Sequence, residues 1–526
     1  MFELLLLYNK IRGLKMKIKL IFPSPSEQYS VPWSTEKINH PLQSGISILA
    51  KNLEEKVSNV NVQCVGNQVV VGDNKKNYDF RYRTIEEFVD LCEDSSVVGM
   101  TVLLNNLSQS IKIAEELKYR NPDQTIVFGG PGVSDFSSAK LIMEKINAVD
   151  YVIKGDGEQA LIDIIEGLNP SEISNSFYRE GDEIKKSEKL FKSNLNERPK
   201  WDYKSFSDYE DIIRAFDSRT DLFQELREEY GNFIGMVGIQ LSKGCEKAET
   251  SGRCFYCVSA QDPKVVMRDA DNFWEQVLHL NKEHGITEYF IVDNVLATPK
   301  KLDALIESRE KYSIPDNVQF RAYGYVPFFF EEEGDSIMEK LENVGIKNLF
   351  LGVENFDKSV NELSNKPGFL YESVEKIVDQ ATQYGIDMFL PIMVGMPGDS
   401  KQSLDYNIEC MEKLLGKYGN KDYGQGGLVR VDLSMAMPLR GTPWYNQLVK
   451  KQEVLDFYLQ ETGTSLLESV DPNYDVLREA SLKFHHSTGL TKIDLDLYRK
   501  EFTEMCCKYI RPDQVGGFEP TVLKED

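Results

Sequence analysis

Three cysteines within 13 residues are the clearest candidates for chemistry in this chain. Cys245, Cys254 and Cys257 follow the spacing C-x8-C-x2-C. Clustered cysteines in an intracellular chain more often bind metal or do redox work than form disulfides. Three thiolates and one further ligand could hold a zinc ion, or three thiolates could bind three irons of a [4Fe–4S] cluster and leave one iron open. No second C-x2-C pair or suitably spaced histidine follows, so the pattern favours the cluster over zinc or unliganded thiols.

Strand and helix patterns alternate through the second half of the chain, and the first of these strands must position the cysteines. The expected strands are Gly238–Leu241, Tyr289–Val292, Val318–Tyr323, Asn348–Gly352, Asp387–Val394 and Arg430–Pro438. Six strand–helix units predict an α/β fold with an open TIM-like barrel, a partial (β/α)6 barrel. Such barrels carry their chemistry at the carboxyl ends of the strands, where the cysteines leave the first strand. Gly244 allows a sharp turn there.

Amphipathic helices are expected between these strands and after them. In the barrel region they are Trp274–His284, Pro299–Lys311, Ser336–Gly345, Leu370–Gly385 and Gln402–Tyr418. Residues 451–526 are expected to be mostly helical, with the clearest helices at Tyr474–Phe484 and Leu495–Tyr509.

The stretch from Gly244 to Cys257 resembles the radical S-adenosylmethionine (SAM) superfamily. Members usually show C-x3-C-x2-C with an aromatic residue before the last cysteine, and Tyr256 stands there in this chain. The first gap is five residues longer here, and Glu246–Arg253 are expected to form an extra loop. The later strands end in segments similar to further family motifs, in the expected order: Asp293-Asn294; Gly352-Val353-Glu354-Asn355 with Lys366 after it; Val394-Gly395-Met396-Pro397-Gly398-Asp399; and Pro438-Leu439-Arg440-Gly441-Thr442-Pro443.

This resemblance implies how the site works. The open iron would chelate the amino and carboxylate groups of SAM, and one electron would cleave the sulfonium bond to give a 5′-deoxyadenosyl radical. Tyr256 is expected near the adenine of SAM, and Glu354 and Gly395 at the barrel rim are expected to contact SAM. The alternative for Glu354 is a rim carboxylate in a structural hydrogen bond. An electron donor such as flavodoxin or ferredoxin is an implied partner.

Residues 16–170 alternate between strands and helices in a way that predicts a flavodoxin-like (Rossmann-like) domain. The expected strands are Ile18–Phe22, Val60–Val65, Ser96–Leu103, Thr125–Phe128 and Tyr151–Ile153, with helices such as Gln43–Val57 and Leu107–Tyr119 between them. Small residues follow the later strands, where they allow a ligand to approach the backbone closely. The candidate ligand-binding residues are Gly99, Thr101, Gly129, Gly130, Pro131, Gly155, Gly157 and Glu158.

Placed ahead of a radical SAM barrel, this domain resembles the cobalamin-binding domain of cobalamin-dependent radical SAM enzymes. The motif D-x-H-x-x-G, which supplies a lower axial histidine to cobalt in other cobalamin proteins, is absent. The cobalt is therefore expected to have no protein histidine below it. His40, the only histidine of the domain, is interpreted as a helix-start residue before Pro41. The alternative is a degenerate cobalamin fold kept for packing or substrate binding.

The expected organisation is a cobalamin-binding domain at 16–170, a connector at 171–235, a radical SAM barrel at 236–450 and a helical region at 451–526. Within the connector, Ser176–Ile184 predict a hairpin that turns at Glu180–Asp182. Met16 is a plausible alternative start, because a strand pattern begins directly after it.

Charge and hydropathy limit the partners. The formal net charge is −23, and general nucleic-acid binding or binding to an anionic membrane needs a basic face. The apolar run Leu4–Leu7 is too short to span a bilayer and has neither a basic n-region nor a cleavage site. We expect a cytoplasmic protein without nucleic-acid or membrane partners.

The cofactors that the resemblance implies are a [4Fe–4S] cluster, SAM and cobalamin. The implied reaction is methylation of an unactivated carbon of a peptide, protein or small metabolite, through a 5′-deoxyadenosyl radical and methylcobalamin. A radical rearrangement, oxidation or epimerisation without methyl transfer is the alternative. An epimerase would need a hydrogen donor such as Cys506 or Cys507, although the neighbours of both predict a buried helix. A non-catalytic iron–sulfur or zinc-binding protein is the interpretation outside this class.

Overall fold

The computed structural model describes residues 15–26, 44–71, 79–133, 135–217, 219–221, 224, 236–259, 262–295, 299–330, 336–419, 427–485, 489–511 and 515–516. The chain divides into two compact units. The first comprises Met1–Gly238 with Gln276–Thr287, and the second comprises Ile239–Glu275 with Glu288–Asp526. His40 and the leader before Met16, apart from Lys15, lie outside the described residues.

Within the described residues, the first unit is built on a seven-stranded sheet in the order β2-β1-β5-β6-β7-β8-β9. Its parallel strands are β1 (Met16–Ile21), β2 (Val60–Val65), β5 (Val97–Thr101), β6 (Thr125–Gly129) and β7 (Tyr151–Ile153). Their order is that of a flavodoxin-like domain, so the predicted fold is confirmed. Adjacent positions such as Val97 and Val98 are both fully buried, because helices cover both faces of a parallel sheet.

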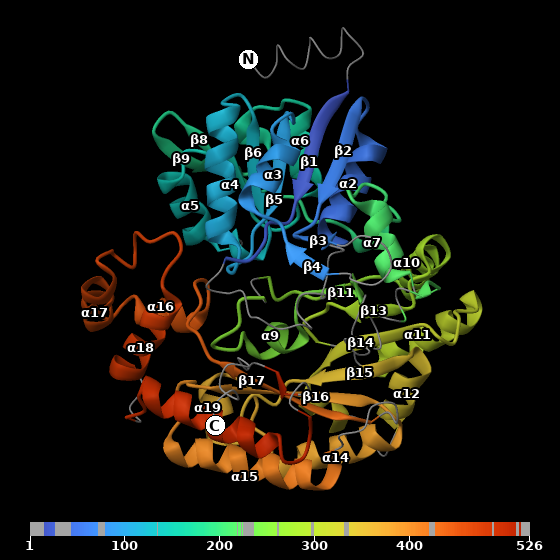
Figure 1. The fold of residues 1–526 in the computed structure, drawn as a ribbon, viewed down its shortest axis with the longest axis vertical. Helices are drawn as coiled ribbons and strands as arrows, with labels where there is room; N and C mark the ends of the chain where they lie inside the picture. Colours follow the sequence, from blue (N-terminus) through green and yellow to red (C-terminus); the bar gives the residue numbers. More distant parts are fainter. Residues whose placement is uncertain are drawn as a thin grey trace. The chain divides into compact units, whose positions relative to one another are not determined.

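The helices of this unit form two groups. Helix α2 contacts α6, and α3 contacts α4. Their bounds, with that of α5, are α2 (Ser44–Lys56), α3 (Ile85–Cys92), α4 (Leu107–Arg120), α5 (Phe136–Lys145) and α6 (Glu158–Ile165). Figure 1 shows α3, α4 and α5 on the near side of the sheet.

An antiparallel hairpin continues the sheet beyond β7. Its strands are β8 (Ser176–Glu180) and β9 (Glu183–Lys186), and Tyr151 of β7 pairs with Tyr178. Gly181, with φ +60°, occupies the turn. The predicted hairpin is therefore confirmed. The remaining elements of this part are β3 (Gln68–Val71), β4 (Asp79–Tyr82) and α7 (Tyr209–Phe216).

The second sheet, in the described part of the chain, has seven strands in the order β10-β13-β14-β15-β16-β17-β18. The strands are β10 (Val237–Ile239), β13 (Glu288–Ile291), β14 (Gln319–Gly324), β15 (Ile346–Leu351), β16 (Asp387–Val394), β17 (Val429–Met435) and β18 (Val515–Gly516). Each strand from β13 to β18 is parallel to the next. The six predicted strands are present, and the seventh, β18, is too short for its pattern to be read.

Helices cover the outer face of this sheet, and α14 packs on β16 (Figure 1). Outward-facing residues such as Leu349, Met388 and Leu390 are fully buried, whereas Phe350 and Phe389 on the opposite face retain partial exposure. The helices of this part are α10 (Ala270–His284), α11 (Pro299–Tyr312), α12 (Ser336–Val344), α13 (Lys358–Leu363), α14 (Tyr371–Gln383), α15 (Lys401–Tyr418), α16 (Pro443–Leu448), α17 (Gln452–Thr462), α18 (Tyr474–Phe484) and α19 (Lys492–Cys506).

None of the helices in the described ranges combines the length and the apolar composition needed to span a bilayer.

Candidate functional site

The cysteine loop follows β10, and two short strands pair where the loop begins and ends. Ser242–Lys243 (β11) pair antiparallel with Val266–Met267 (β12) on the far side of the loop. Gly244 begins the loop with φ +88°, and a Cβ there would lie 2.2 Å from the carbonyl oxygen of Lys264. Both the backbone conformation and the space therefore require glycine at this position.

The residues between the first two cysteines form a helix, which corrects the expectation of an extra loop. Helix α9 spans Glu246–Ser251, and Cys245 stands at its N-cap with extended backbone. Gly252 ends the helix with φ +82° and donates its N–H to the carbonyl oxygen of Ala248 at 3.1 Å. Glu, Lys and Ala favour a helix, but six residues cannot hold one alone. Contacts with other loops must stabilise it.

The Asp293-Asn294 pair after β13 holds the start of the cysteine loop. The Asp293 carboxylate accepts hydrogen bonds from the Leu241 N–H at 2.9 Å and from the Ser242 hydroxyl at 2.5 Å. Burial raises the pKa of Asp293 to about 6, and the hydrogen bonds from Ser242 act against that rise. The Asn294 amide donates to the carbonyl oxygen of Gly244 at 2.7 Å. The pair therefore fixes the chain directly before Cys245.

Glu354 and Lys366 form a buried ion pair after β15. The Lys366 Nζ lies 2.8 Å from the Glu354 Oε1, and the side chains are only 8% and 15% exposed. Gly352 makes room for the lysine, because a Cβ there would lie 2.8 Å from the Lys366 Nζ. Glu354 has φ +61°, a conformation that costs a non-glycine residue on the order of 1 kcal/mol or more. Backbone hydrogen bonds with Pro391 and Met393 of β16 hold it there.

Asp399 organises the loop that follows β16. It is fully buried, and its carboxylate accepts four hydrogen bonds. The donors are the N–H groups of Gly395 (2.8 Å) and Met396 (3.1 Å), the Asn355 amide (2.9 Å) and the Ser403 hydroxyl (3.0 Å). Burial raises the pKa of Asp399 to about 6, while the hydrogen bonds favour the ionised form. Since Asn355 is adjacent to Glu354, the carboxylate links the two loops predicted to contact SAM.

Asn407 extends this link from α15. Its amide donates to the Asn355 side-chain oxygen at 3.1 Å, and its own oxygen accepts the Phe356 N–H at 2.7 Å. Asn407 is fully buried. Sequence reasoning missed this residue, because a lone asparagine on a helix carries no signal until its partners are known.

The three cysteines lie in one electrostatic neighbourhood with the rim residues. Burial raises the pKa of the Cys245 and Cys254 thiols, and the nearby Cys257 adds to the rise of each. The Lys366 charge lowers the pKa of Cys254. Burial also raises the pKa of Tyr256, and the Glu354 carboxylate adds to the rise. The structure thus brings Cys254, Tyr256, Glu354 and Lys366 together.

The donor set fits an iron–sulfur cluster. Within the described residues, no group of three or more His, Cys, Asp or Glu side chains is arranged to hold a metal ion. A [4Fe–4S] cluster does not need ligands that meet at one point, because each cysteine binds a different iron. All three thiols are partly accessible and outside any disulfide, so they are available as thiolate ligands.

Charged and aromatic side chains on the inner face of the second sheet were not predicted. The Arg321 guanidinium carbon lies 5.6 Å, 5.9 Å and 5.1 Å from the ring centres of Phe290, Phe350 and Phe389. Tyr323 packs edge-on to Phe350 at 5.1 Å. Burial raises the pKa of Asp432 on β17. A charge at alternate positions of a buried strand was the signal that could have found these residues.

In the first unit, the turn after β6 depends on its glycines. Gly130 has φ +97°, and a Cβ there would lie 2.9 Å from the carbonyl oxygen of Val102. At Gly129 a Cβ would have space, because the nearest atom would be the Ile153 carbonyl oxygen at 4.0 Å. Pro131 is exposed and begins a short 3-10 turn. This turn therefore presents backbone with little side-chain cover.

The turn after β7 has an open backbone, but its acidic residue is already paired. Gly155 has φ +90° with nothing within 4 Å of an added Cβ. Gly157 caps α6. The Glu158 carboxylate is 7% exposed and forms an ion pair with Arg198 at 2.8 Å. Its contacts in the described structure are therefore structural.

The two candidates on β5 also have structural contacts. Gly99 lies in the strand interior, where a Cβ would meet the Leu20 side chain at 2.9 Å. Glycine at this position therefore leaves room for the Leu20 side chain. Thr101 ends the strand, and its carbonyl oxygen accepts the Asn106 amide at 3.1 Å. Asn106, which is 1% exposed, also donates to the Pro23 carbonyl oxygen at 3.1 Å and thereby joins the loops after β1 and β5.

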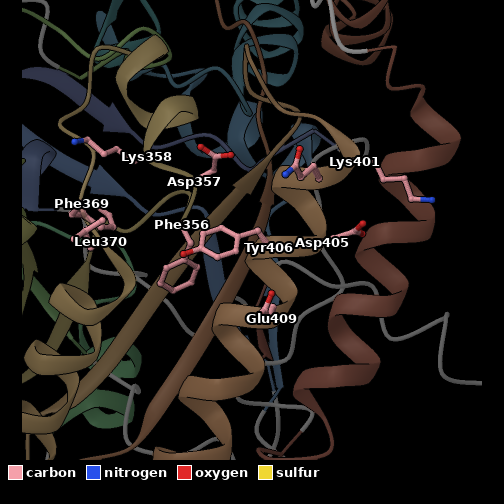
Figure 2. Close-up of a pocket in the computed structure, with 10 residues that line it drawn as sticks. Phe356, Asp357, Lys358, Phe369, Leu370, Lys401, Asp405, Tyr406 and Glu409 are labelled. Atoms are coloured by element: carbon pink, nitrogen blue, oxygen red, sulfur yellow. The ribbon is translucent and has the colours of Figure 1, made fainter.

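A surface pocket of about 750 Å³ lies beside the predicted SAM loops (Figure 2). It is lined by Phe356, Asp357, Lys358, Phe369, Leu370, Lys401, Gln402, Asp405, Tyr406 and Glu409. None of the cysteines or predicted cofactor contacts is among these residues. The linked residues Asn355 and Asp399 stand one residue before Phe356 and two residues before Lys401, so the pocket flanks the link without including it.

Two family models match the sequence in the order that the folds suggest. The B12 binding domain matches residues 41–165, and the radical SAM superfamily matches residues 239–410. The chain carries a B12-binding domain followed by a radical SAM domain. With these two domains, it is a cobalamin-dependent radical SAM enzyme. The predicted cofactors, cobalamin for the B12-binding domain and SAM with a [4Fe–4S] cluster for the radical SAM domain, are confirmed at this level.

Solved structures share the fold of both domains. OxsB, a cobalamin-dependent SAM radical enzyme with aqua-cobalamin and SAM bound, is 15% identical, with a TM-score of 0.64 over 94% of this chain and 68% of its own. The radical SAM methyltransferase TsrM from Kitasatospora setae, with tryptophan substrate and a SAM analog bound, is 14% identical, with a TM-score of 0.58 over 83% and 76%. No curated protein matches the sequence significantly.

Proposed function

We propose that the protein methylates an unactivated carbon of a peptide, protein or small metabolite. The observation that carries this proposal is the presence of a B12-binding domain and a radical SAM domain in one chain. When bound, the cluster would supply the electron that cleaves SAM to a hydrogen-abstracting radical, and cobalamin would supply a methyl group. A chain that binds both has the two reagents such a methylation needs. That TsrM is a methyltransferase supports testing this reaction first.

The residues of the radical SAM domain divide this work among them. Cys245, Cys254 and Cys257 hold the cluster. Tyr256, Glu354 and the Gly395 turn contact SAM, and the Glu354–Lys366 ion pair keeps the acidic group in place. In the B12-binding domain, the turns at Gly129-Gly130-Pro131 and Gly155–Gly157 receive the corrinoid, with no histidine on cobalt.

The inner face of the sheet is the proposed substrate surface. Arg321 and Asp432 offer a donor and an acceptor, and the ring of Phe350 stacks on Phe389 at 4.8 Å. A surface of this kind accepts a substrate that has apolar and polar groups. Reduction by a flavodoxin or ferredoxin in the cytoplasm completes the proposal.

The experiment measures the products of SAM. The reconstituted enzyme is reduced anaerobically with SAM that carries a deuterated methyl group, first without substrate. Methyl transfer predicts about one S-adenosylhomocysteine per bound corrinoid, with the label in the corrinoid fraction. With a substrate, 5′-deoxyadenosine and S-adenosylhomocysteine should form in comparable amounts, and the product should carry three deuteriums. If 5′-deoxyadenosine forms without S-adenosylhomocysteine or label transfer, the reaction is a rearrangement, oxidation or epimerisation instead.

A further inference from the structure

The eight residues between Cys245 and Cys254 join the cysteine loop to two other loops of the radical SAM domain. Lys247 on α9 is 5% exposed. Its ammonium group donates to the carbonyl oxygen of Gly252 at 2.7 Å and to that of Asn365. A buried ammonium group is unfavourable unless such acceptors surround it. Its hydrogen bonds therefore define where α9 must lie relative to Asn365.

Asn365 returns two hydrogen bonds to the same segment. Its side-chain amide donates to the carbonyl oxygens of Arg253 at 2.8 Å and Ser251 at 3.2 Å. Asn365 has φ +51°, a conformation that asparagine tolerates better than most residues. The next residue is Lys366, whose ammonium group pairs with Glu354. The α9 segment and the residue before Lys366 thus hold each other.

Arg253 makes the second connection. Its Nη2 donates to the carbonyl oxygens of Cys257 at 2.5 Å and Gly441 at 2.9 Å. Gly441 belongs to the loop after β17, and the neighbouring Trp444 N–H donates to the carbonyl oxygen of Phe255 at 3.0 Å. The stretch between Cys254 and Cys257 is therefore held from the β17 side as well.

We propose that the inserted segment positions the cluster ligands against the SAM-binding rim, with Lys247, Arg253 and Asn365 as the positioning residues. Together these three are called the α9 clamp. The inference rests on the proposed cluster and SAM sites. It gives the longer C-x8-C spacing a role: the insertion sets the relative place of Cys254 and Lys366, two groups on loops that β10 and β15 deliver separately. A segment that merely filled space would make apolar contacts, whereas Lys247 and Arg253 donate hydrogen bonds to carbonyl oxygens of Asn365 and Gly441 on neighbouring loops.

Two variants test the α9 clamp in the reconstituted full-length enzyme. Lys247→Met removes the ammonium group, and Asn365→Gly removes the amide while keeping a residue that adopts positive φ without strain. Lys413→Met is the matched control, because Lys413 is 58% exposed on α15 and pairs only with Glu409 among the described residues. The measurements are iron and sulfide per chain, SAM affinity, and the EPR spectrum of the reduced cluster with and without SAM.

We expect both clamp variants to retain the cluster, to bind SAM about tenfold more weakly, and to show an altered EPR change on SAM addition, because outer-shell partners orient the groups that they hold. Loss of iron with wild-type circular dichroism also supports the proposal, since Cys254 would no longer be held. Wild-type SAM affinity and EPR in both variants, or loss of the fold in both, overturns it. If Cys→Ala at all three cysteines leaves the iron content unchanged, the cluster site itself is wrong, which is a separate failure.

Discussion

The turn after β6 in the B12-binding domain and the loops after β13 and β16 in the radical SAM domain are held by different kinds of contact. In the B12-binding domain, the turn after β6 is tied by backbone hydrogen bonds, from Val102 N–H to the Gly129 carbonyl at 2.7 Å and from Gly132 N–H to the Val102 carbonyl at 2.9 Å. In the radical SAM domain, buried side chains join the loops, as Asp399 and Asp293 do. Backbone ties leave a surface free for a large ligand, whereas side-chain networks fix individual groups.

This difference predicts which substitutions each edge tolerates. Adding a single methyl group should destabilise the turn after β6, because its glycine has positive φ and lies close to neighbouring backbone. In the radical SAM domain, removing one member of a buried ion pair should be costly, because the partner is left buried without compensation. Neutralising a buried carboxylate that has only neutral partners should not be, because burial already disfavours its charge. Four experiments test this contrast, the last of them on the B12-binding domain.

The largest effect is expected at the cysteines of the radical SAM domain. Changing Cys245, Cys254 and Cys257 together to alanine should reduce iron and sulfide to background and abolish SAM cleavage, because no other ligand replaces three thiolates. Chemical iron and sulfide analysis after anaerobic reconstitution measures this. The corrinoid content of the same variant should stay at the wild-type level. Four irons per chain in the triple variant would show that the cluster is elsewhere.

Lys366→Met should lower the free energy of unfolding by about 3 kcal/mol, because it leaves Glu354 charged and buried. Urea unfolding measures the change. The control is Lys358→Met, whose partner Glu362 and own side chain are more than half exposed, at 55% and 57%. This control should cost less than about 1 kcal/mol. Equal losses in the two variants would contradict the contrast between the buried and the exposed pair.

Asp293→Asn should make the unfolding free energy less dependent on pH. Since burial raises the folded-state pKa of Asp293 to about 6, the neutral carboxyl contributes stability below pH about 4, and this contribution is lost as the pH rises through 6. Asparagine stays neutral and can still bond Leu241 and Ser242. The free energy of unfolding of the variant, relative to that of the wild type, should therefore rise by roughly 2–3 kcal/mol between pH 4 and 7. A difference that stays constant over that range would show that folding does not raise the pKa of Asp293.

The smallest effect is expected at the glycines of the B12-binding domain. Gly130→Ala should cost about 2 kcal/mol, from positive φ together with the approach to Val102. Gly155→Ala has open space and should cost about 1 kcal/mol from backbone strain alone. Thermal unfolding compares them, and bound corrinoid is measured in parallel. If Gly155→Ala is the more harmful substitution, space does not limit the turn after β6.

The boundaries of helices α19 and α9 differ in how far the sequence predicts them. Helix α19 begins at Lys492, three residues before the predicted Leu495. Thr491 and Asp494 form a capping box there, a local signal that the apolar pattern alone did not include. Helix α9 is a different case, because its six residues carry no apolar period and depend on Lys247 and Asn365.

The sequence by itself determined both folds and the order of the candidate motifs. Hydrophobic runs of strand length, glycines after strands and the cysteine spacing all act within a few residues, so they can be read without contacts. Tertiary structure alone decided that Glu158 pairs with Arg198 and that Arg321 lies among three phenyl rings. It also decided that Asp399 joins two loops. These partners stand tens of residues apart in most cases, and only the strand order of the folded sheets makes them neighbours.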